Sequence, residues 1–354
     1  MSRFFSKRYA SLTPYTPGEQ PQDRKYIKLN TNESPFPPSA RAIAAAAEEA
    51  GRLQLYSDPE CLRLRQALAE RYAVKPEQVI VTNGSDEALN FAFMAFCDEE
   101  HPAVFADITY GFYPVYAEIN HVPYREIPLR EDLTIAPEDF YDAKGTIVLA
   151  NPNAQTGVAL PRTAVEEIIR RNAENIVIVD EAYVDFGGES CVELTEKYDN
   201  LLVVQTFSKS RSMAGARLGF AIGNEALITD LNTIRYSNNP YNVNRMTLAA
   251  GVGILADRTY TEANCRTIVE NRAFTEQALQ ELGFMMPPSS ANFLLARHAA
   301  VGGETLYRKL KERGILVRHF SKERICESIR ITIGTREQME ALVANIREIL
   351  EETE

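Results

Sequence analysis

The sequence has few of the residues that build metal sites and disulfide frameworks. Its 354 residues include no tryptophan, only five cysteines and only four histidines. No Cys-x-x-Cys or His-Glu-x-x-His spacing occurs, so we expect no metal site and free thiols in a reducing cytoplasm. The chain also lacks a run of about 18 apolar residues, and residues 1–8 carry positive charge without the apolar core of a secretion signal. We therefore expect a cytoplasmic protein that does not span a membrane.

Basic residues are in the minority. Lysine and arginine total 38 against 49 aspartate and glutamate residues, which gives a formal net charge of −11. Nucleic acid and anionic membrane surfaces repel such a chain, so we expect neither as a partner. An anionic small molecule would have to be held by local arginines or by helix ends.

The sequence does contain a series of short apolar runs separated by helical patterns. These runs predict buried strands at residues 79–81, 103–106, 146–150, 176–179, 201–205 and 218–222. Strands that alternate with helices predict an α/β fold, here a three-layer α/β/α domain with a mainly parallel sheet. Helical patterns and three further apolar runs after residue 245 predict a smaller α+β domain.

One glycine pair mimics a dinucleotide-binding fingerprint. Gly251 and Gly253 lie within the helical pattern 246–255, and no strand precedes them. A dinucleotide fingerprint needs a strand directly before its glycines. We therefore interpret the two glycines as a close packing contact between helices.

Polar clusters follow five of the predicted strands. They lie at residues 82–86, 107–110, 151–153, 180–183 and 208–209. In open α/β sheets the ligand crevice lies outside the carboxyl ends of the strands. We therefore expect the five clusters to converge on one site.

Two charged residues in these clusters suggest chemistry. Lys209 follows a buried run and is surrounded by hydroxyls and two arginines, a setting that lowers an amine's pKa and makes it nucleophilic; the alternative is a solvated loop lysine. Asp180 ends a strand, where a carboxylate needs a cationic partner such as a protonated heteroaromatic nitrogen. Tyr183 and Asn153 could then bond a ring hydroxyl. The alternatives for Asp180 are a metal pair with Glu181 or a structural role.

A third cluster suggests an anion site. The stretch Gly84-Ser85-Asp86-Glu87 joins a strand to an apolar helix, and helix N-termini bind phosphate. Ser208 and Arg217 could reach the same anion, whereas the alternative is an ordinary helix cap. A nucleophilic lysine, a carboxylate for a pyridine nitrogen, a phenol for a ring oxygen and a phosphate cup together indicate pyridoxal 5′-phosphate.

The chain resembles fold-type-I pyridoxal-phosphate-dependent aminotransferases over nearly its whole length, and most closely histidinol-phosphate aminotransferases. The motifs that carry the resemblance lie at residues 14–18, 29–35, 56–59, 84–87, 180–183, 208–209 with Arg217, 317–320 and 329–335. The resemblance implies an aspartate-aminotransferase-like large domain, a homodimer, and reversible amino transfer between L-histidinol phosphate and 2-oxoglutarate in histidine biosynthesis. Aromatic amino-acid aminotransferases and threonine-phosphate decarboxylases share the scaffold and stay open as alternatives, as does a cofactor-binding regulator without turnover.

The resemblance also implies roles at the cofactor ring. Lys209 would bond the cofactor aldehyde and then carry a proton as general acid and base, which makes it catalytic together with Asp180 and Tyr183. Asp180 would pair with the pyridine nitrogen, and Tyr183 and Asn153 with the ring oxygen. Tyr110 would stack on the ring.

Further roles concern the two anionic ends. The resemblance assigns the phosphate cup to Gly84, Ser85, Asp86, Ser208 and Arg217. Tyr56 would reach the cofactor phosphate of the partner subunit. Arg330 would grip the anionic end of a substrate through a bidentate fork. The substrate side would also be lined by Tyr15, Asn32 and Arg318.

One loop departs from the pattern Asn-Pro-x-Asn-Pro-Thr-Gly that is common in the family. This chain has Asn151-Pro152-Asn153-Ala154-Gln155-Thr156-Gly157, so the second asparagine and the second proline are absent. Either Asn153 shifts to serve the ring oxygen or that hydrogen bond is missing.

The resemblance divides the chain into three segments. Residues 1–30, rich in proline and tyrosine, would form an N-terminal arm that contributes to the small domain and to dimer contacts. Residues 31–245 would form the large pyridoxal-phosphate-binding domain. Residues 246–354 would form the small C-terminal domain.

Overall fold

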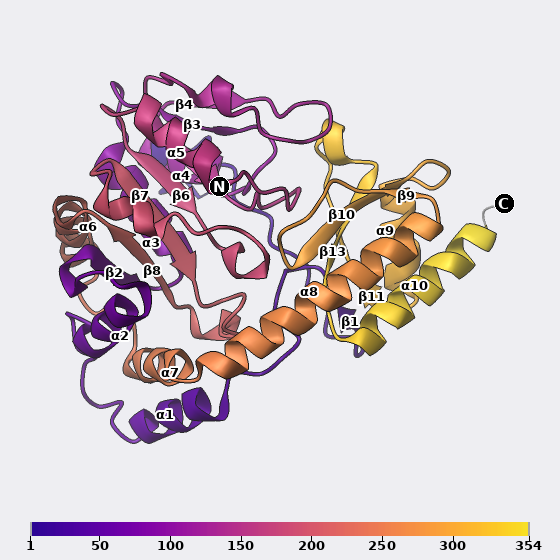
Figure 1. Ribbon diagram of the computed structural model, residues 1–354, viewed down its shortest axis with the longest axis horizontal. Coiled ribbons are helices and arrows are strands. Elements are labelled where there is room, and N and C mark those ends of the chain that lie inside the picture. Colours follow the sequence, from indigo (N-terminus) through magenta and orange to yellow (C-terminus); the bar gives the residue numbers. More distant parts are fainter. Residues whose placement is uncertain (1, 353–354) are drawn as a thin grey trace.

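A mixed sheet of seven strands lies at the centre of the larger lobe in the computed structural model, which describes residues 2–352 (Figure 1). Its strand order is β2-β8-β7-β6-β5-β3-β4, and β8 alone runs antiparallel to its neighbours β2 and β7. The strands are β2 (Val79–Thr82), β3 (Ala103–Ala106), β4 (Tyr124–Ile127), β5 (Thr146–Ala150), β6 (Val177–Asp180), β7 (Leu201–Thr206) and β8 (Gly219–Gly223). The expected α/β fold with a mainly parallel sheet is confirmed.

Helices cover both faces of this sheet, which explains the apolar runs. Every residue of β5, β6 and β7 is buried, as expected for strands covered on both sides. The helices of this lobe are α1 (Ala40–Ala50), α2 (Leu62–Tyr72), α3 (Ser85–Phe96), α4 (Tyr113–Asn120), α5 (Arg162–Arg171), α6 (Glu225–Asn238) and α7 (Arg245–Leu255). The edge strand β4 exposes three of its four residues and was not predicted, because an exposed edge needs no apolar run.

The smaller lobe is built on an antiparallel sheet of four strands, in the order β12-β13-β10-β9. These strands are β9 (Phe284–Met285), β10 (Phe293–His298), β12 (Arg318–His319) and β13 (Ser328–Thr332). The sheet is accompanied by α9 (Gly303–Glu312) and α10 (Arg336–Glu351). The long helix α8 (Arg258–Glu281) runs from α7 to α10 and so connects the two lobes (Figure 1).

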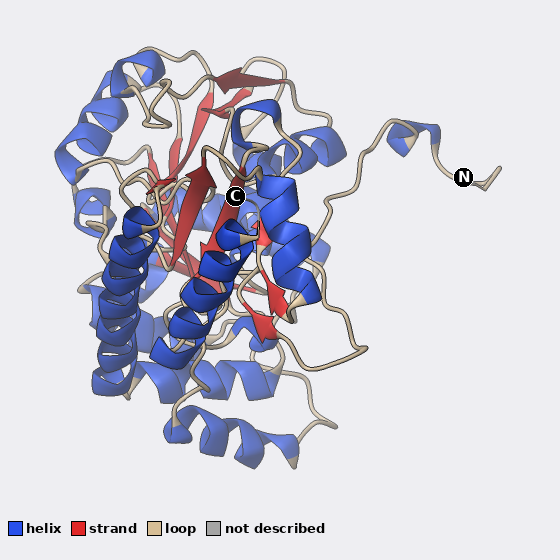
Figure 2. Cartoon of the chain, turned by 90° about the vertical axis from the view of Figure 1, so that its right-hand side faces the viewer, coloured by secondary structure: helices blue, strands red, loops and turns tan. Residues whose placement is uncertain are grey.

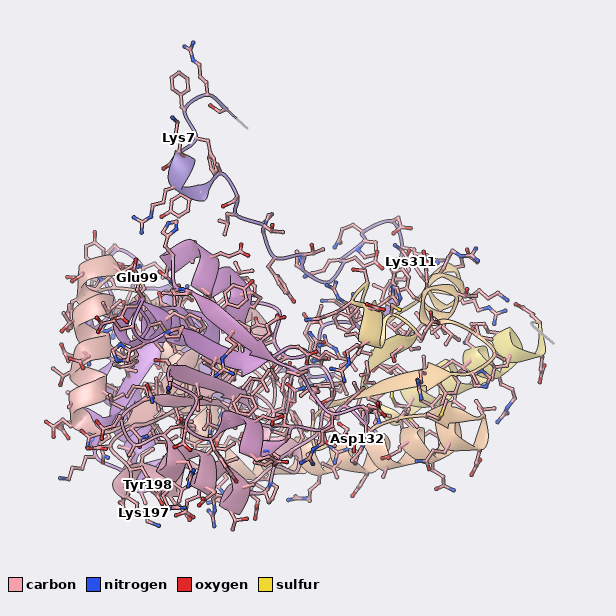
Figure 3. The ribbon with its side chains drawn as sticks, turned by 90° about the horizontal axis from the view of Figure 1, so that it is seen from above. Lys7, Glu99, Asp132, Lys197, Tyr198 and Lys311 are labelled. Carbon is pink, nitrogen blue, oxygen red and sulfur yellow. The ribbon has the colours of Figure 1, made fainter. Side chains whose placement is uncertain are left out.

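The first part of the chain is an arm that joins the smaller lobe. Its strand β1 (Ile27–Lys28) pairs in parallel with β11 (Ile315–Leu316). Before β1, the chain carries the short helix η1 (Lys7–Tyr9), and this part of the arm stands away from the body both from the side (Figure 2) and from above (Figure 3). Tyr9 stacks on His121 at the end of α4, with ring centroids 5.7 Å apart. The arm therefore contacts both lobes.

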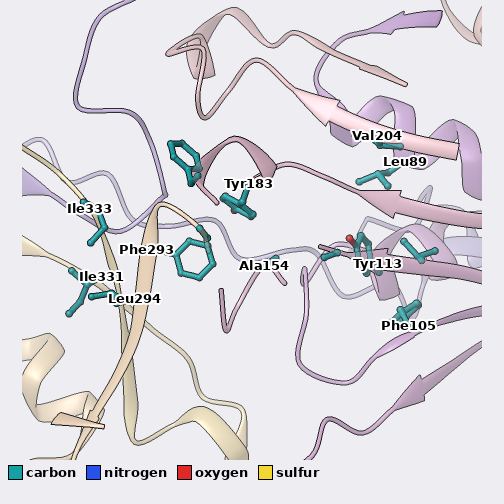
Figure 4. Close-up of a cluster of buried hydrophobic side chains, with 14 of the residues drawn as sticks. Leu89, Phe105, Tyr113, Ala154, Tyr183, Val204, Phe293, Leu294, Ile331 and Ile333 are labelled. Atoms are coloured by element: carbon teal, nitrogen blue, oxygen red, sulfur yellow. The ribbon is translucent and has the colours of Figure 1, made fainter. Parts of the chain in front are cut away.

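A continuous apolar cluster links the two lobes. It extends from Leu89 of α3 through Tyr183 to Phe293 of β10 and Ile331 of β13 (Figure 4). The rings of Tyr183 and Phe293 meet edge to face, with centroids 5.1 Å apart. Shared packing of this kind fixes the smaller lobe against the end of the large sheet.

The glycine pair of α7 packs closely against other elements. A Cβ atom on Gly253 would lie 2.8 Å from the Cα atom of Ala42 in α1, and one on Gly251 would lie 2.6 Å from a methyl carbon of Leu218. The helix-packing interpretation is therefore confirmed. The division of the chain at residues 30 and 245 stays a prediction; α7 itself packs on α1 and α2 beside the large sheet.

Within residues 2–352, no helix combines the length and the apolarity needed to cross a membrane.

Candidate active site

The polar clusters after the strands meet in one cavity of about 420 Å³. Each of the five predicted clusters contributes to its lining, through Ser85, Tyr110, Pro152, Asp180 and Lys209. The expected convergence is therefore confirmed. A larger cavity of about 540 Å³ lies along α8 and contains none of these five residues. The arrangement follows from the parallel order of β3, β5, β6 and β7, whose carboxyl ends meet at one edge.

Lys209 lies in the turn that follows β7. Its Nζ atom donates a hydrogen bond to the main-chain oxygen of Thr31 at 3.1 Å and lies 5.7 Å from the ring centroid of Tyr183. Burial lowers the pKa of Lys209 to about 8, and the positive charge of Arg330 acts in the same direction. A usable fraction of the amine is thus neutral near neutral pH, which is the form that attacks a carbonyl carbon.

Asp180, the last residue of β6, lies at the floor of the cavity. One carboxylate oxygen accepts a hydrogen bond from the Tyr113 hydroxyl at 2.8 Å, and the other accepts from the main-chain N–H of Ala182 at 3.2 Å. Burial raises the pKa of Asp180 to about 6. No cation among residues 2–352 forms an ion pair with this carboxylate, so it is suited to a cationic ligand atom.

Tyr183 is held in place by a residue just after β1. Its hydroxyl oxygen accepts a hydrogen bond from the Asn32 side-chain amide at 3.0 Å. Asn32 is in turn fixed by Thr332 of β13, whose hydroxyl accepts from the Asn32 main-chain N–H at 2.9 Å. Asn32 therefore connects the cavity with the smaller lobe.

The phosphate-cup residues gather at the N-terminus of α3. Asp86 accepts hydrogen bonds from the hydroxyls of Tyr110 at 2.7 Å and Tyr116 at 3.1 Å, and pairs with Arg217 at 2.8 Å. Gly84 is the N-cap residue with φ +84°, and a Cβ atom there would lie 2.7 Å from the Nη2 atom of Arg217. Only glycine lets the guanidinium lie this close to the helix end.

Ser208 extends the same group. Its hydroxyl lies 3.4 Å from the Nη1 atom of Arg217, and both residues line the cavity. Gly84 has no side chain to accept hydrogen bonds from the first turn of α3. The helix end, the hydroxyl and the guanidinium together can bind an anion.

Three predicted substrate residues, Tyr15, Arg318 and Arg330, are not among the residues that line the cavity. Arg330 of β13 donates to the main-chain oxygen of Ala154 at 3.1 Å. Tyr15 packs against Phe112 with ring centroids 4.3 Å apart, and burial raises the pKa of its phenol. Arg318 of β12 donates through both terminal nitrogens to main-chain oxygens of residues 16 and 17 and so fixes the arm.

Asn153 and Tyr56, predicted to contact the cofactor, also lie outside the cavity lining. The Asn153 amide donates to the main-chain oxygen of Ile108 at 2.8 Å and to the Thr156 hydroxyl at 3.0 Å. Its amide nitrogen is thus used within the protein, by the main chain at Ile108 and by Thr156 of the same loop. Tyr56 is 79% exposed and stacks on Tyr241, with ring centroids 4.4 Å apart.

Tyr113 and Tyr116, whose hydroxyls bond Asp180 and Asp86, were not predicted from the sequence. Both lie in α4, and nothing in their spacing distinguishes them from core aromatics. Nor was the main-chain oxygen of Thr31, which no side-chain pattern can reveal.

These residues fit pyridoxal phosphate. The decisive observation is a buried carboxylate without a cationic partner opposite a buried lysine of lowered pKa, with an anion site beside them. Lys209 could hold the aldehyde carbon, Asp180 the ring nitrogen, Tyr183 the ring oxygen, and the cup residues the phosphate.

Comparison with known proteins agrees with this site. The family described as aminotransferase class I and II matches residues 24–346. The chain belongs to the class I and II aminotransferases. It is 47% identical over 354 residues to a histidinol-phosphate aminotransferase of Dechloromonas aromatica, covering 99% of each chain. It is 49% identical over 352 residues to a histidinol-phosphate aminotransferase of a Marinomonas species, covering 98% of this chain and 99% of the relative.

Solved structures of aminotransferases share the fold. The histidinol-phosphate aminotransferase of Sinorhizobium meliloti, determined in complex with pyridoxal 5′-phosphate, superposes with a TM-score of 0.91 over 99% of both chains at 23% identity. An L-threonine-O-3-phosphate decarboxylase of Porphyromonas gingivalis superposes with a TM-score of 0.81 over 92% of this chain and 99% of its own, also at 23% identity. The fold is therefore common to both activities.

Proposed function

We propose that this aminotransferase moves an amino group between L-histidinol phosphate and 2-oxoglutarate with pyridoxal phosphate as cofactor, a step of histidine biosynthesis. The observation that carries the proposal is the single cavity lined by Lys209, Asp180 and Tyr183. Support for the substrate comes from relatives called histidinol-phosphate aminotransferases, which are 47% and 49% identical over almost their whole length.

When bound, pyridoxal phosphate supplies the aldehyde and the electron-withdrawing ring on which amino transfer depends. Lys209 would supply the amine that holds the aldehyde carbon, and its Nζ atom would carry the proton to and from the substrate Cα. Asp180 would hold a proton on the ring nitrogen, and the Tyr113 hydroxyl fixes the orientation of that carboxylate. Tyr183, fixed by Asn32, would donate or accept at the ring oxygen.

Arg330 accounts for the use of two different anions. The amino donor ends in a phosphate and the amino acceptor carries carboxylates, and a guanidinium binds both groups through parallel hydrogen bonds. Arg318 and Tyr15 add a cation and a phenol near Arg330. The charge of Arg318 acts on the pKa of both Tyr15 and Arg330, so the three groups lie within electrostatic reach of one another. A phosphorylated donor matches this set better than an apolar amino acid does.

The test compares amino donors on the purified protein with pyridoxal phosphate. Formation of glutamate from 2-oxoglutarate is measured with L-histidinol phosphate, L-phenylalanine and L-threonine phosphate. We expect kcat/KM for L-histidinol phosphate to exceed the other two by at least about tenfold, the scale of one buried polar contact. A preference for phenylalanine would mean that the substrate is an aromatic amino acid. Release of carbon dioxide from threonine phosphate would mean that the reaction is a decarboxylation.

A Lys209→Ala variant separates an enzyme from a cofactor-binding regulator. We expect it to lose turnover and to retain pyridoxal phosphate without a covalent bond, because Asp180 and the phosphate cup remain. Lys25→Ala, at an exposed lysine of the arm, is the control. Unchanged turnover in the Lys209 variant would contradict the proposed chemistry.

We further propose that the protein is a homodimer in which Tyr56 reaches the partner's cofactor phosphate. A group of exposed apolar side chains, called here the α1–α2 patch, supports this; it comprises Ile43, Leu53, Leu55, Tyr56 and Tyr241, which are between 43% and 79% exposed. Patches of this kind mark protein interfaces. Arg245 fixes the backbone of the patch by donating to the main-chain oxygens of Leu55 and Tyr56.

We also propose that the protein acts in the cytoplasm. Its five cysteines are free thiols, and four of them are buried. Free thiols of this kind are typical of a reducing compartment.

A further inference from the structure

Arg330 is a cation with unused hydrogen-bond donors. Its guanidinium carbon lies 5.1 Å from the ring centroid of Phe293 and 5.3 Å from that of Phe320. Among residues 2–352, partners are found only for Nη1, which donates to the main-chain oxygen of Ala154 at 3.1 Å and to the side-chain oxygen of Gln155 at 3.0 Å. Nε is buried without an acceptor, and within residues 2–352 no carboxylate pairs with this side chain.

Gln155 lies in the loop that departs from the family pattern. The common residue at this position is proline, which has no side-chain acceptor, and the common asparagine before it is Ala154 in this chain. The hydrogen bond between Gln155 and Arg330 therefore arises from the departure itself. The other two amides of the loop have other partners, since Asn151 bonds the main chain of Leu160 and the Asn153 nitrogen bonds Ile108 and Thr156. Gln155 is thus the amide of the loop that bonds Arg330.

The position of the two acceptors decides which part of Arg330 stays available. Nε and Nη2 lie on one side of the guanidinium and form a two-donor edge that matches a carboxylate or a phosphate. Both acceptors, Ala154 and Gln155, bind Nη1 at the other end. We propose that Gln155 is a positioning and specificity residue, whose carbonyl fixes Nη1 so that the Nε–Nη2 edge of Arg330 receives the anionic group of the substrate.

The neutrality of Gln155 is part of this role. An amide accepts a hydrogen bond from Arg330 without neutralising the guanidinium, so the full charge is kept for the substrate. A carboxylate at the same place would form an ion pair with Arg330 and compete with the substrate anion. The inference rests on the proposed function, because the anion in question is the phosphate of the donor or a carboxylate of the acceptor.

The test uses two variants of the pyridoxal-phosphate-loaded enzyme that keep the length of the side chain. Gln155→Met removes the acceptor, and Gln155→Glu replaces it with a negative charge. We expect Gln155→Met to raise KM for L-histidinol phosphate about tenfold with kcat changed less than about threefold, the scale of one hydrogen bond to a charged group. We expect Gln155→Glu to raise KM about a hundredfold, because a charge is added beside Arg330.

Binding of inorganic phosphate to the same enzymes, measured by calorimetry, gives a readout that is independent of turnover. We expect the affinity for phosphate to fall in the same order, wild type, Gln155→Met, Gln155→Glu, with an unchanged melting temperature. Gln280→Glu is the matched control, because Gln280 is exposed in α8 and makes no side-chain hydrogen bond. The same charge change there leaves KM and phosphate binding unchanged.

Two outcomes would overturn the inference. KM and phosphate affinity within twofold of the wild type in both variants would mean that Gln155 does not position Arg330. A fall in kcat alone would show that the residue affects another step. Failure of the proposed function is recognised separately, since it appears as absence of L-histidinol phosphate turnover in the unchanged protein, whereas phosphate binding by the variants still tests Gln155.

Discussion

The two ionisable groups at the centre of the cavity, Lys209 and Asp180, have pKa values moved in opposite directions by the same cause. Burial penalises the charged form of each group, so the lysine pKa falls to about 8 and the aspartate pKa rises to about 6. Their partners are neutral groups, Thr31 for the amine and Tyr113 for the carboxylate. Both groups can therefore change their protonation state near neutral pH, as an acid–base site requires.

The raised pKa of Asp180 makes a prediction about the cofactor-free protein. A pKa raised from 3.8 to about 6 means that the folded state binds the proton more tightly than the unfolded state does. Burying the charged carboxylate therefore lowers the free energy of unfolding. This loss is full above about pH 6 and disappears below pH 3.8. The shift of about two pKa units corresponds to a loss of about 3 kcal/mol in the free energy of unfolding at pH 8.

We therefore expect Asp180→Asn to raise the melting temperature of the cofactor-free protein at pH 8, and to raise it less at pH 5. Melting curves at the two pH values measure the difference, and Asp230→Asn, at an exposed position of α6, serves as control. An equal gain at both pH values would show that proton binding by Asp180 is not the cause.

At this scale the sequence predicts some residues of the site and not others. Asp180 and Lys209 could be found because each ends a buried strand or follows one, and the carboxyl ends of parallel strands meet. Tyr113 could not be found, because its contact with Asp180 joins positions 67 residues apart. Gln155 was seen only as a departure from a pattern, and its bond to Arg330 spans 175 residues.

At the scale of elements, the helices α1 and α7 pack closely against each other. Gly253 faces the backbone of α1, where an added Cβ would lie 2.8 Å from both the Cα atom of Ala42 and the main-chain oxygen of Arg41. Backbone atoms cannot rotate away as a flexible side chain can, so the helices would have to separate.

We expect Gly253→Ala to lower the free energy of unfolding by about 1–3 kcal/mol, as overpacking does. Urea denaturation measures the change. Gly51→Ala is the matched control, because Gly51 caps α1 with φ −71° and an added Cβ would have its nearest neighbour at 3.8 Å. Equal effects of the two substitutions would mean that the loss of glycine flexibility, and not the close contact with α1, causes the change in the free energy of unfolding.

A second element-scale contact fastens the smaller lobe to the larger one. Arg324, in the short helix η7 (Glu323–Ile325), pairs with Asp107 at 2.8 Å and donates to the main-chain oxygens of Leu129 and Arg130. Lys322 donates to the main-chain oxygen of Asp107. These bonds join the smaller lobe to the loop that carries Tyr110.

We expect Arg324→Ala to increase amide hydrogen exchange at residues 318–327 without a comparable change in α5, since it removes three of the bonds that hold this segment. Mass spectrometry of the exchanged peptides measures it. Arg170→Ala is the control, because Arg170 pairs with Glu167 on the exposed side of α5. Equal exchange in η7 of both variants would show that Arg324 does not hold the two lobes together.

Strand positions were predictable where both faces are covered, and less so elsewhere. The runs that became β5, β6 and β7 are apolar throughout, because helices lie on both sides. One of the three apolar runs after residue 245, at residues 315–318, divides between β11, which pairs with β1, and β12, which pairs with β13. The partner of β11 lies near residue 27, and no local pattern can reveal a partner so distant.

For the whole molecule, the proposed dimer depends on the α1–α2 patch. Leu55 is 58% exposed within it and lies next to Tyr56. We expect Leu55→Glu to shift the protein from dimer to monomer in sedimentation velocity runs, because a charge in an apolar interface loses its hydration. Turnover should fall with the dimer, since the proposed role of Tyr56 needs the partner.

Met285→Glu is the control for this test. Met285 is 46% exposed in β9, on the smaller lobe and away from the patch. We expect this variant to stay dimeric and active. A monomer that keeps full activity in the Leu55 variant would contradict the role given to Tyr56.

The pairing of β1 with β11 has a consequence for a chain that is still being made. Leu29 forms hydrogen bonds with Leu316 and Thr332, and Asn32 forms them with Asn292 and Thr332. These partners are synthesised some 300 residues after Leu29 and Asn32, so the bonds cannot form before then. At 5–20 residues per second the delay is roughly 15–60 s. The large sheet can assemble during that time, but Asn32, which bonds the Tyr183 hydroxyl, is not fixed by Thr332 until the end. We expect the nascent protein to complete its active site last.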